Sequence, residues 1–314
     1  GELSFGADGG VEGFSLSGGA RLEGEGRSGR ADRAVEVPGE RLWVLTGDAK
    51  TSAMLEEGGS RISAPRIEID EGRKIVRARG GGARAVLAPS TKGANATLVG
   101  DTSKPTFGKA DEIVFDQSAK TASLKGHAAL WQEGSSLFGQ DITLNESERS
   151  VAAVGRVRAI LAPGADRSAA DPAAPTVLTA GKLLYREEAA GEGDSPAGSA
   201  ALDGGLAAAR GAWQARGQSG KVRIGKDRKV ERLELTGSVE LSDSASGRRG
   251  QAEHAVDYPA EGRTILEGKP ARVSDREGNA VAGAILTITE RGRRVEVTAP
   301  EGGTTETIHQ TRRD

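Results

Sequence analysis

Apolar and polar residues alternate over short stretches of this chain, and the alternation predicts β-hairpins. Residues 110–116 form one predicted strand, 117–120 a polar turn, and 121–130 a second strand with apolar side chains at 122, 124, 128 and 130. Residues 221–224 and 232–241 repeat the pattern around a turn at 225–228. Because strand side chains alternate between faces, each hairpin has one apolar face.

The same glycine phrase, Gly-x-(Ala/Val/Pro/Trp)-x-x, recurs near the end of these alternating segments. Successive copies lie 26–56 residues apart, which indicates a repeated unit stretched in places by insertions. Such a series predicts a stack of hairpins rather than a globule with one cleft. The phrase glycines are Gly18, Gly47, Gly81, Gly126, Gly155, Gly211, Gly237 and Gly268.

A glycine inside a strand weakens it and usually marks a bulge or a sharp bend. Repeated at one place in each hairpin, it predicts a bend in register, so that the stack folds into a V-shaped or rolled trough. The predicted fold class is therefore all-β, an open roll of serial β-hairpins with about 16–18 strands in series. The alanine-rich stretch at 204–210 is a possible helical turn.

Segments rich in Pro, Gly, Ala, Ser and charge interrupt the repeats, and they predict loop insertions at 88–106 and 186–209. A third such segment, at 162–176, is the expected boundary between two parts of the stack. The predicted organisation is a first segment at 1–170, a second at 171–300, and a polar tail at 301–314.

Composition narrows the function. Lys and Arg (43) nearly balance Asp and Glu (45), so no charged field points to nucleic acid as a partner. Cysteine is absent, which excludes disulfides and thiolate metal sites, and no run approaches 18 apolar residues. Aromatic residues make up only 3%, so the interior must be built from small aliphatic side chains. Because the sequence begins at Gly1, we expect a leader or membrane anchor to be missing from it.

The sequence gives little support for a catalytic site or a metal site. His127, His254 and His309 fall in different repeats at no metal-ligand spacing, and no nucleophile elbow or phosphate-binding loop occurs. We therefore expect no catalytic residues, no metal and no cofactor. A carbohydrate-active enzyme remains a remote alternative, because some stacked β-folds carry paired carboxylates on one sheet face.

Three segments of the chain resemble a known family. They are residues 250–258, 263–273 and 283–288, which resemble the OstA-like superfamily of periplasmic lipopolysaccharide-transport proteins (LptA, LptC and the N-terminal domain of LptD). The family unit runs roughly G-x-A-D-x-I-x-Y-D, a turn, then L-x-G-N-(P/A/V)-x-(L/F), and the copies at 108–130, 217–241 and 250–273 follow it. The asparagine after the glycine is replaced here by His127, Ser238 and Lys269.

The resemblance implies an elongated β-jellyroll whose interior cradles the acyl chains of lipopolysaccharide in the periplasm. The residues lead to a similar idea, because acyl chains need a continuous apolar lining and each buried CH₂ contributes about 0.8 kcal/mol. The strand-like ends of the sequence, residues 3–5 and 294–298, predict in addition that the chain pairs by its sheet edges with other jellyroll proteins, or end to end with itself, to form a bridge from the inner to the outer membrane.

The predicted lipid groove consists of the inward apolar positions of the best repeats. These are Ile113, Phe115, Leu124, Leu130, Ile142, Leu144, Val222, Ile224, Leu233, Leu235, Val239, Leu241, Leu286 and Ile288. Core packing is the ordinary role of each, and it is also expected for Trp43, Trp131 and Trp213. The main alternative is therefore a structural or adhesive β-solenoid scaffold, in which the same side chains fill the core and nothing passes through.

Overall fold

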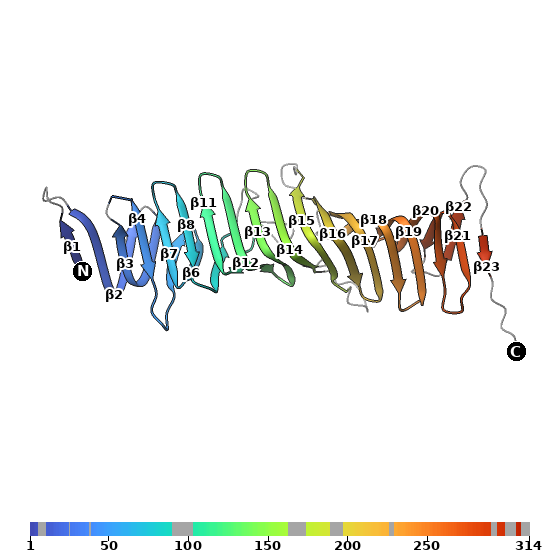
Figure 1. Ribbon diagram of the computed structural model, residues 1–314, viewed down its shortest axis with the longest axis horizontal. Coiled ribbons are helices and arrows are strands. Elements are labelled where there is room, and N and C mark those ends of the chain that lie inside the picture. Colours follow the sequence, from blue (N-terminus) through green and yellow to red (C-terminus); the bar gives the residue numbers. More distant parts are fainter. Residues whose placement is uncertain are drawn as a thin grey trace. The chain divides into compact units, whose positions relative to one another are not determined.

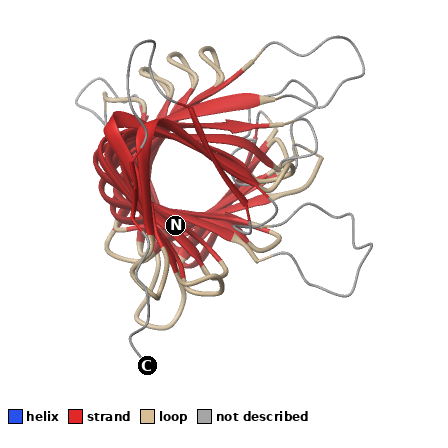
Figure 2. Ribbon diagram, turned by 90° about the vertical axis from the view of Figure 1, so that its right-hand side faces the viewer, coloured by secondary structure: helices blue, strands red, loops and turns tan. Residues whose placement is uncertain are grey.

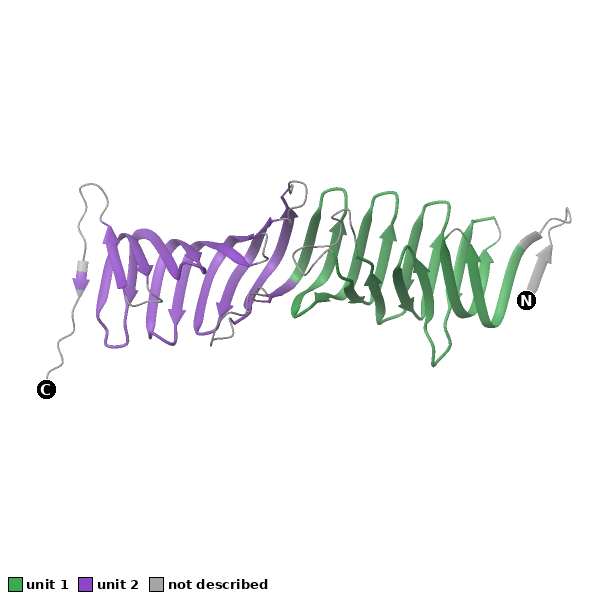
Figure 3. Ribbon diagram, turned by 180° about the vertical axis from the view of Figure 1, so that it is seen from behind, with its two compact units in different colours: residues 1–155 green, residues 156–314 purple. Residues whose placement is uncertain are grey.

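The computed structural model describes residues 1–5, 11–24, 26–37, 39–89, 103–162, 174–188, 197–225, 229–289, 294–298 and 306–308. These residues form 23 β-strands and no helix (Figures 1 and 2). The described residues thus contain no helix long and apolar enough to cross a membrane. They divide into two compact units, residues 1–155 and 156–314 (Figure 3). The expected all-β fold of serial hairpins is confirmed.

Unit 1 combines long strands with a run of short ones. It opens with β1 (Glu2–Phe5), β2 (Val11–Gly24) and β3 (Arg27–Val37). Eight five-residue strands follow: β4 (Leu42–Thr46), β5 (Ala53–Glu57), β6 (Ser60–Ala64), β7 (Arg66–Asp70), β8 (Ile75–Arg79), β9 (Ala83–Leu87), β10 (Thr106–Ala110) and β11 (Glu112–Asp116). The unit closes with β12 (Thr121–Gln132), β13 (Ser135–Asn145) and the first half of β14 (Ser150–Leu161).

Two antiparallel ladders run side by side through unit 1. One passes from β3 through β4, β7, β8 and β11 to β12. The other passes from β3 through β5, β6, β9 and β10 to the opposite half of β12. The chain crosses between the ladders at four corners, 47–52, Pro65, 80–82 and Asp111. Each pair of short strands is therefore one long hairpin arm that is broken where the sheet bends.

Unit 2 keeps its arms continuous. Its strands are β15 (Thr176–Glu187), β16 (Gly198–Arg210), β17 (Trp213–Ile224), β18 (Val230–Asp243), β19 (Arg248–Tyr258), β20 (Arg263–Ser274), β21 (Ala280–Thr289), β22 (Arg294–Thr298) and β23 (Glu306–Ile308). From β15 to β21, each strand pairs antiparallel with the next in sequence. β21 then pairs with β22 along one half and with β23 along the other.

The bends occur at a two-residue bulge that the glycine phrases mark. Gly126 and His127 both have positive φ, 74° and 49°, and the ladder register shifts across them. Gly237 and Ser238 repeat this arrangement at 82° and 47°. Left-handed backbone suits glycine and then asparagine, which explains the Gly-Asn pair of the family unit. The predicted bend in register is confirmed at these positions.

Three details of the sequence interpretation are wrong. Gly211 lies in the turn between β16 and β17, and the bend of β16 falls at Gly204 and Gly205 instead (φ 82° and 86°). Residues 198–209 of the expected insertion 186–209, including the supposed helical turn, are therefore strand, because two glycines in an alanine-rich segment permit a bulge. Within the predicted polar tail, residues 306–308 form β23, which pairs with β21.

The described residues form 23 strands, more than the expected 16–18. One reason is that each of the four corners of unit 1 divides a long arm into two short strands. Most of the other insertion, 88–106, lies outside the described residues. The expected segment boundary near 170 falls within residues 163–173, which are likewise outside them, and it stays a prediction.

Inward positions in both units are small or branched aliphatic side chains. Leu124 and Leu130 in unit 1, and Leu233 and Leu235 in unit 2, are at most 1% exposed. Outward positions carry charge: Glu68 of β7 bonds Arg66 and Arg79, and Arg77 bridges it to Glu112. Burial raises the pKa of Glu68, but the hydrogen bonds from Arg79 and Arg66 outweigh this and lower the pKa overall. The alternation therefore separates an apolar inner face from a charged outer face.

We expect Gly126→Ala to destabilise unit 1 by more than the roughly 1–2 kcal/mol that a left-handed backbone costs an L-residue. A Cβ at Gly126 would clash with the Asp111 carboxylate, so Asp111 would have to move as well. Gly18→Ala is the matched control, because Gly18 has a similar φ of 76° and nothing within 4 Å of the added Cβ. Urea denaturation followed by tryptophan fluorescence measures both; equal losses would contradict the contact with Asp111.

Candidate functional site: a groove between two rows of turns

The two ends of the bent strands form two rows of turns in unit 2. One row contains the turns after β16, β18 and β20, and the other contains the turns after β17 and β19. The bulges lie midway along the strands, so the sheet folds back there and its inner face is enclosed from two sides. A groove therefore runs along the inner face, with its mouth between the two rows.

A cavity of about 640 Å³ opens at this mouth. Trp213 and Ser246 line it from the first row, and Lys229 and Pro259 line it from the second. Apolar side chains form much of the wall, including Leu161, Val230, Leu241, Val273 and Ile288. Its size lies within the range of about 300–1,000 Å³ that is typical of small-molecule sites. The cavity can therefore hold an apolar chain of moderate length.

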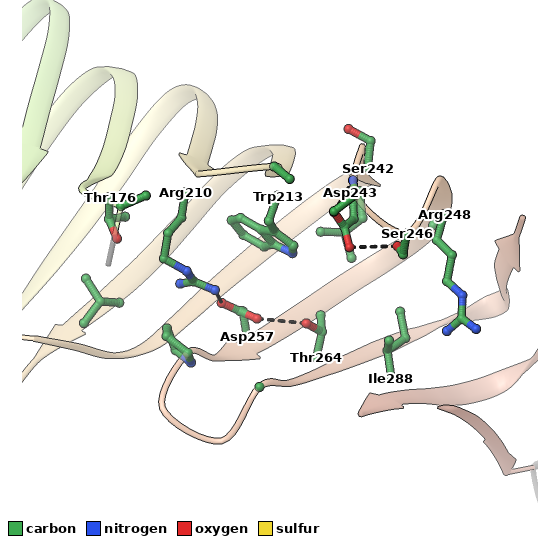
Figure 4. A pocket seen from close by; sticks show the side chains of 18 of the residues that line it. Thr176, Arg210, Trp213, Ser242, Asp243, Ser246, Arg248, Asp257, Thr264 and Ile288 are labelled. Atoms are coloured by element: carbon green, nitrogen blue, oxygen red, sulfur yellow. Dashed lines mark hydrogen bonds and ion pairs between the residues drawn. The ribbon is translucent and has the colours of Figure 1, made fainter. Parts of the chain in front are cut away.

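One ion pair crosses the mouth of the groove (Figure 4). Arg210 ends β16 in the first row, and its Nη2 donates to Asp257 Oδ2 of β19 at 2.9 Å, near the second row. Thr264 of β20 donates its hydroxyl to Asp257 Oδ1 at 2.8 Å. The guanidinium of Arg210 also lies 5.3 Å from the ring centroid of Trp213. We call Arg210, Asp257 and Thr264 the polar crossing.

Burial makes the polar crossing energetically demanding. The side chain of Asp257 is 4% exposed and that of Arg210 is 26% exposed. A buried carboxylate is tolerated only when charge and hydrogen bonds compensate for its lost hydration. Arg210 and Thr264 provide this compensation. The arrangement holds the two rows of turns at a set separation beside the cavity.

Unit 1 has a smaller counterpart of the same arrangement. A cavity of about 260 Å³ lies between its two ladders, with Leu55 on one side and Trp43 and Ile69 on the other. Arg27 lines it and bonds Glu57 at 2.7 Å. Gln117, in a turn of the opposite ladder, bonds both Arg27 and Glu57 at 3.0–3.2 Å. Each unit therefore has a pocket lined in part by apolar side chains and by an arginine that takes part in a polar connection.

The predicted groove residues all lie on strands, six in unit 1 and eight in unit 2. Twelve of the fourteen are buried, and Phe115 and Ile288 are half-buried. Only Leu241 and Ile288 of this set line the 640 Å³ cavity. The structure thus distributes the set over two inner faces rather than gathering it at one site, and whether any of these residues contacts lipid stays a prediction.

Histidines and tryptophans have varied surroundings. His127 Nδ1 lies 2.8 Å from Asp111, and its side chain is 92% exposed on the outer face. His254 lies 3.2 Å from both Glu234 and Glu267, whereas His309 is outside the described residues. Within the described ranges, no group of three or more histidine, aspartate or glutamate side chains has an arrangement that could hold a metal ion. The expectation that Trp131 packs in the core is wrong, because Trp131 is 40% exposed and its ring stacks on that of Phe107.

The sequence analysis did not predict the polar crossing, although the sequence contains one indication of it. Asp257 occupies an inward position of β19, in register with the buried Leu233. A carboxylate at such a position is rare unless it is paired. The identity of its partner could not be read, because Arg210 precedes it by 47 residues and reaches it only through the fold-back of the sheet.

Comparison with known proteins supports the resemblance seen in the sequence. Residues 83–150, less than half of the chain, match the family described as LptA/(LptD N-terminal domain) LPS transport protein. The resemblance to the OstA-like superfamily is thus confirmed over this segment. No curated protein matches the chain.

Among solved structures, the chain is similar to LptH from Pseudomonas aeruginosa, described as the LptA homologous periplasmic component of the conserved lipopolysaccharide transport device. The two are 18% identical, and the match covers 46% of this chain and 90% of that one, with a TM-score of 0.34. At this TM-score the similarity carries no argument about the present chain.

Breaking the polar crossing should reveal its asymmetry. We expect Arg210→Met to destabilise unit 2 by about 3 kcal/mol, because it leaves Asp257 charged, buried and bonded only by Thr264. Asp257→Asn should cost less, since Arg210 is partly exposed and can reach water. The double variant should recover much of the Arg210→Met loss, as measured in a double-mutant cycle of urea denaturation followed by tryptophan fluorescence. Additive losses would show that the pair is not coupled.

Proposed function

We propose that this chain, which carries a segment of the LptA/LptD N-terminal domain family, is a periplasmic protein that binds the acyl chains of lipopolysaccharide and forms part of the bridge from the inner to the outer membrane. The family match at residues 83–150 supports lipopolysaccharide transport as the process. The observation that carries the proposal is the 640 Å³ apolar cavity at the groove mouth of unit 2. We propose no catalytic role and no cofactor.

The cavity explains how lipid is held. Apolar side chains line its wall, while Arg210, Lys229 and Arg248 line it from the turns and strand ends at the mouth. A lipid lying there would bury its chain against the wall and keep its headgroup at the mouth, near water. Burial of each CH₂ contributes about 0.8 kcal/mol, so a chain of moderate length is enough for stable binding.

The structural scaffold remains the second candidate, and one observation favours it. Leu235 and most of the predicted groove residues are almost completely buried, as in a filled core. The two candidates therefore differ in one respect, namely whether lipid reaches the inner face beside the cavity.

Site-specific photo-crosslinking tests the proposal. A photo-reactive residue at Leu241 or Ile288 should form adducts with lipopolysaccharide, because both line the cavity. The same residue at the adjacent positions Glu240 or Thr287 should not, since neighbours in a strand point to opposite faces. Leu235, which is fully buried, serves as a third position that should give no adduct. Crosslinks that are equal from both faces, or absent at Leu241 and Ile288, would favour the filled scaffold.

Bridge formation requires open sheet edges, and the N-terminal edge offers one. β1 pairs with β2, and no other strand among the described residues pairs with it. At the opposite end, β22 and β23 both occupy the free side of β21. An unpaired edge is a template for another strand, so β1 is the edge that we propose for pairing with a jellyroll partner or a second copy.

We expect the chain to self-associate with increasing concentration through β1. Adjacent residues of an edge strand direct their N–H groups alternately toward the neighbouring strand and away from it. Of Leu3→Pro and Ser4→Pro, one should therefore abolish association and leave the fold intact, while the other disturbs the pairing with β2. Sedimentation velocity over a concentration series measures this. A chain that stays monomeric and binds no jellyroll partner would contradict the bridge.

A further inference from the structure

Arg210 occupies a distinctive position at the mouth of the unit 2 cavity. Its guanidinium is held from one side by Asp257 at 2.9 Å and lies 5.3 Å from the ring of Trp213. These two contacts fix the direction of the side chain, while about a quarter of its surface (26%) stays exposed. Arg210 is therefore oriented before any ligand arrives, which reduces the entropy cost of binding.

Arg210 retains hydrogen-bonding capacity beyond the polar crossing. A guanidinium has five N–H donors, arranged as a planar fork that suits carboxylate and phosphate groups. Among the described residues, the guanidinium of Arg210 donates to Asp257 through Nη2. Donors on the remaining nitrogens can therefore reach an anionic group placed at the mouth of the cavity.

The charge of the cavity lining is also biased. Arg210, Lys229, Arg248 and Arg249 line it together with only two carboxylates, Asp243 and Asp257, which leaves an excess of two positive charges (4 − 2). The chain as a whole has a net charge of −2, so the excess is a local property. A neutral amphiphile would gain nothing from it, whereas an anionic headgroup would be attracted.

We propose that this cavity binds an anionic amphiphile, with its alkyl chain on the apolar wall and its phosphate or carboxylate headgroup on Arg210. Arg210 is then the residue that determines headgroup specificity, and Asp257 and Trp213 position it. This inference rests on the proposed lipid-binding function and adds a requirement to it, namely that binding depends on headgroup charge.

Calorimetric titration of the full chain with three probes of equal chain length tests the inference. The probes are dodecyl phosphate, dodecanoate and the uncharged dodecyl maltoside, each below its micelle-forming concentration. The wild-type chain should bind at least one anionic probe about tenfold to a hundredfold more tightly than the uncharged one, as expected for a charge-assisted hydrogen bond. The relative affinities of phosphate and carboxylate identify the headgroup chemistry.

Variants assign the preference to a residue. Arg210→Gln should abolish the preference for the anionic probes over dodecyl maltoside, and Arg210→Lys should retain part of it. Asp257→Asn should strengthen it, because the amide oxygen can still accept from Nη2 and hold the guanidinium in place, whereas the competing negative charge is removed. Arg216→Gln is the matched control: it removes the same charge from an exposed position on β17 that does not line this cavity, and the preference should persist.

The outcomes separate the inference from the function on which it rests. Equal binding of charged and uncharged probes overturns the headgroup role of Arg210 and leaves lipid binding intact. Binding of none of the probes overturns both. If Arg210→Gln fails to fold, the increase expected for Asp257→Asn decides the question, and an unchanged or weaker preference in that variant overturns the inference. An equal effect of Arg216→Gln also overturns it, because the preference would then reflect general charge.

Discussion

The whole structure depends on one constraint, which is that each sheet has a single apolar face and no helix in the described part of the chain covers it. An antiparallel sheet can bury such a face only against another layer or against itself. Both units take the second route, and they bend each hairpin arm at its middle. Along the short strands of unit 1 the bend breaks each arm into two strands, whereas in β12 and in the long strands of unit 2 a two-residue bulge keeps the strand continuous. Backbone conformation at residues such as Gly126 and Gly237 is thus what permits a core at all.

Folding a sheet back on itself leaves the far ends of the arms apart, and this produces the grooves. Aliphatic side chains fill the region near the bulges, as the full burial of Leu235 shows. Toward the turns the two halves diverge, and cavities remain between them in each unit. A charged pair such as Arg210 and Asp257 is a costly way to connect the halves, because both groups lose hydration. Its benefit is specificity, since it sets the spacing of the rows and directs a guanidinium to the cavity mouth.

The family match and the 640 Å³ cavity lie in different units. Residues 83–150 belong to unit 1, whereas the cavity with the polar crossing belongs to unit 2. Both units nevertheless repeat one plan, with bent arms, an apolar inner face, a charged outer face and a polar connection across the groove. A repeated plan of this kind lets one chain extend its apolar inner face by adding hairpins, because each hairpin buries its face largely against its neighbours.

The alternation of residues determined the strands, their inner face and the all-β class, because period two is a local property that each hairpin expresses independently. The glycine phrases likewise located most bends, since a positive φ is a demand on a single residue. The tertiary structure decided where some strands bend and which residues far apart in the sequence come into contact. Gly211 has the same phrase as Gly126 yet lies in a turn, because strand register placed the bend of β16 at Gly204 and Gly205. Arg210 and Asp257 are brought together across 47 residues by the fold-back of the sheet. No local pattern encodes such a contact, since it depends on how far each strand is displaced along its neighbours.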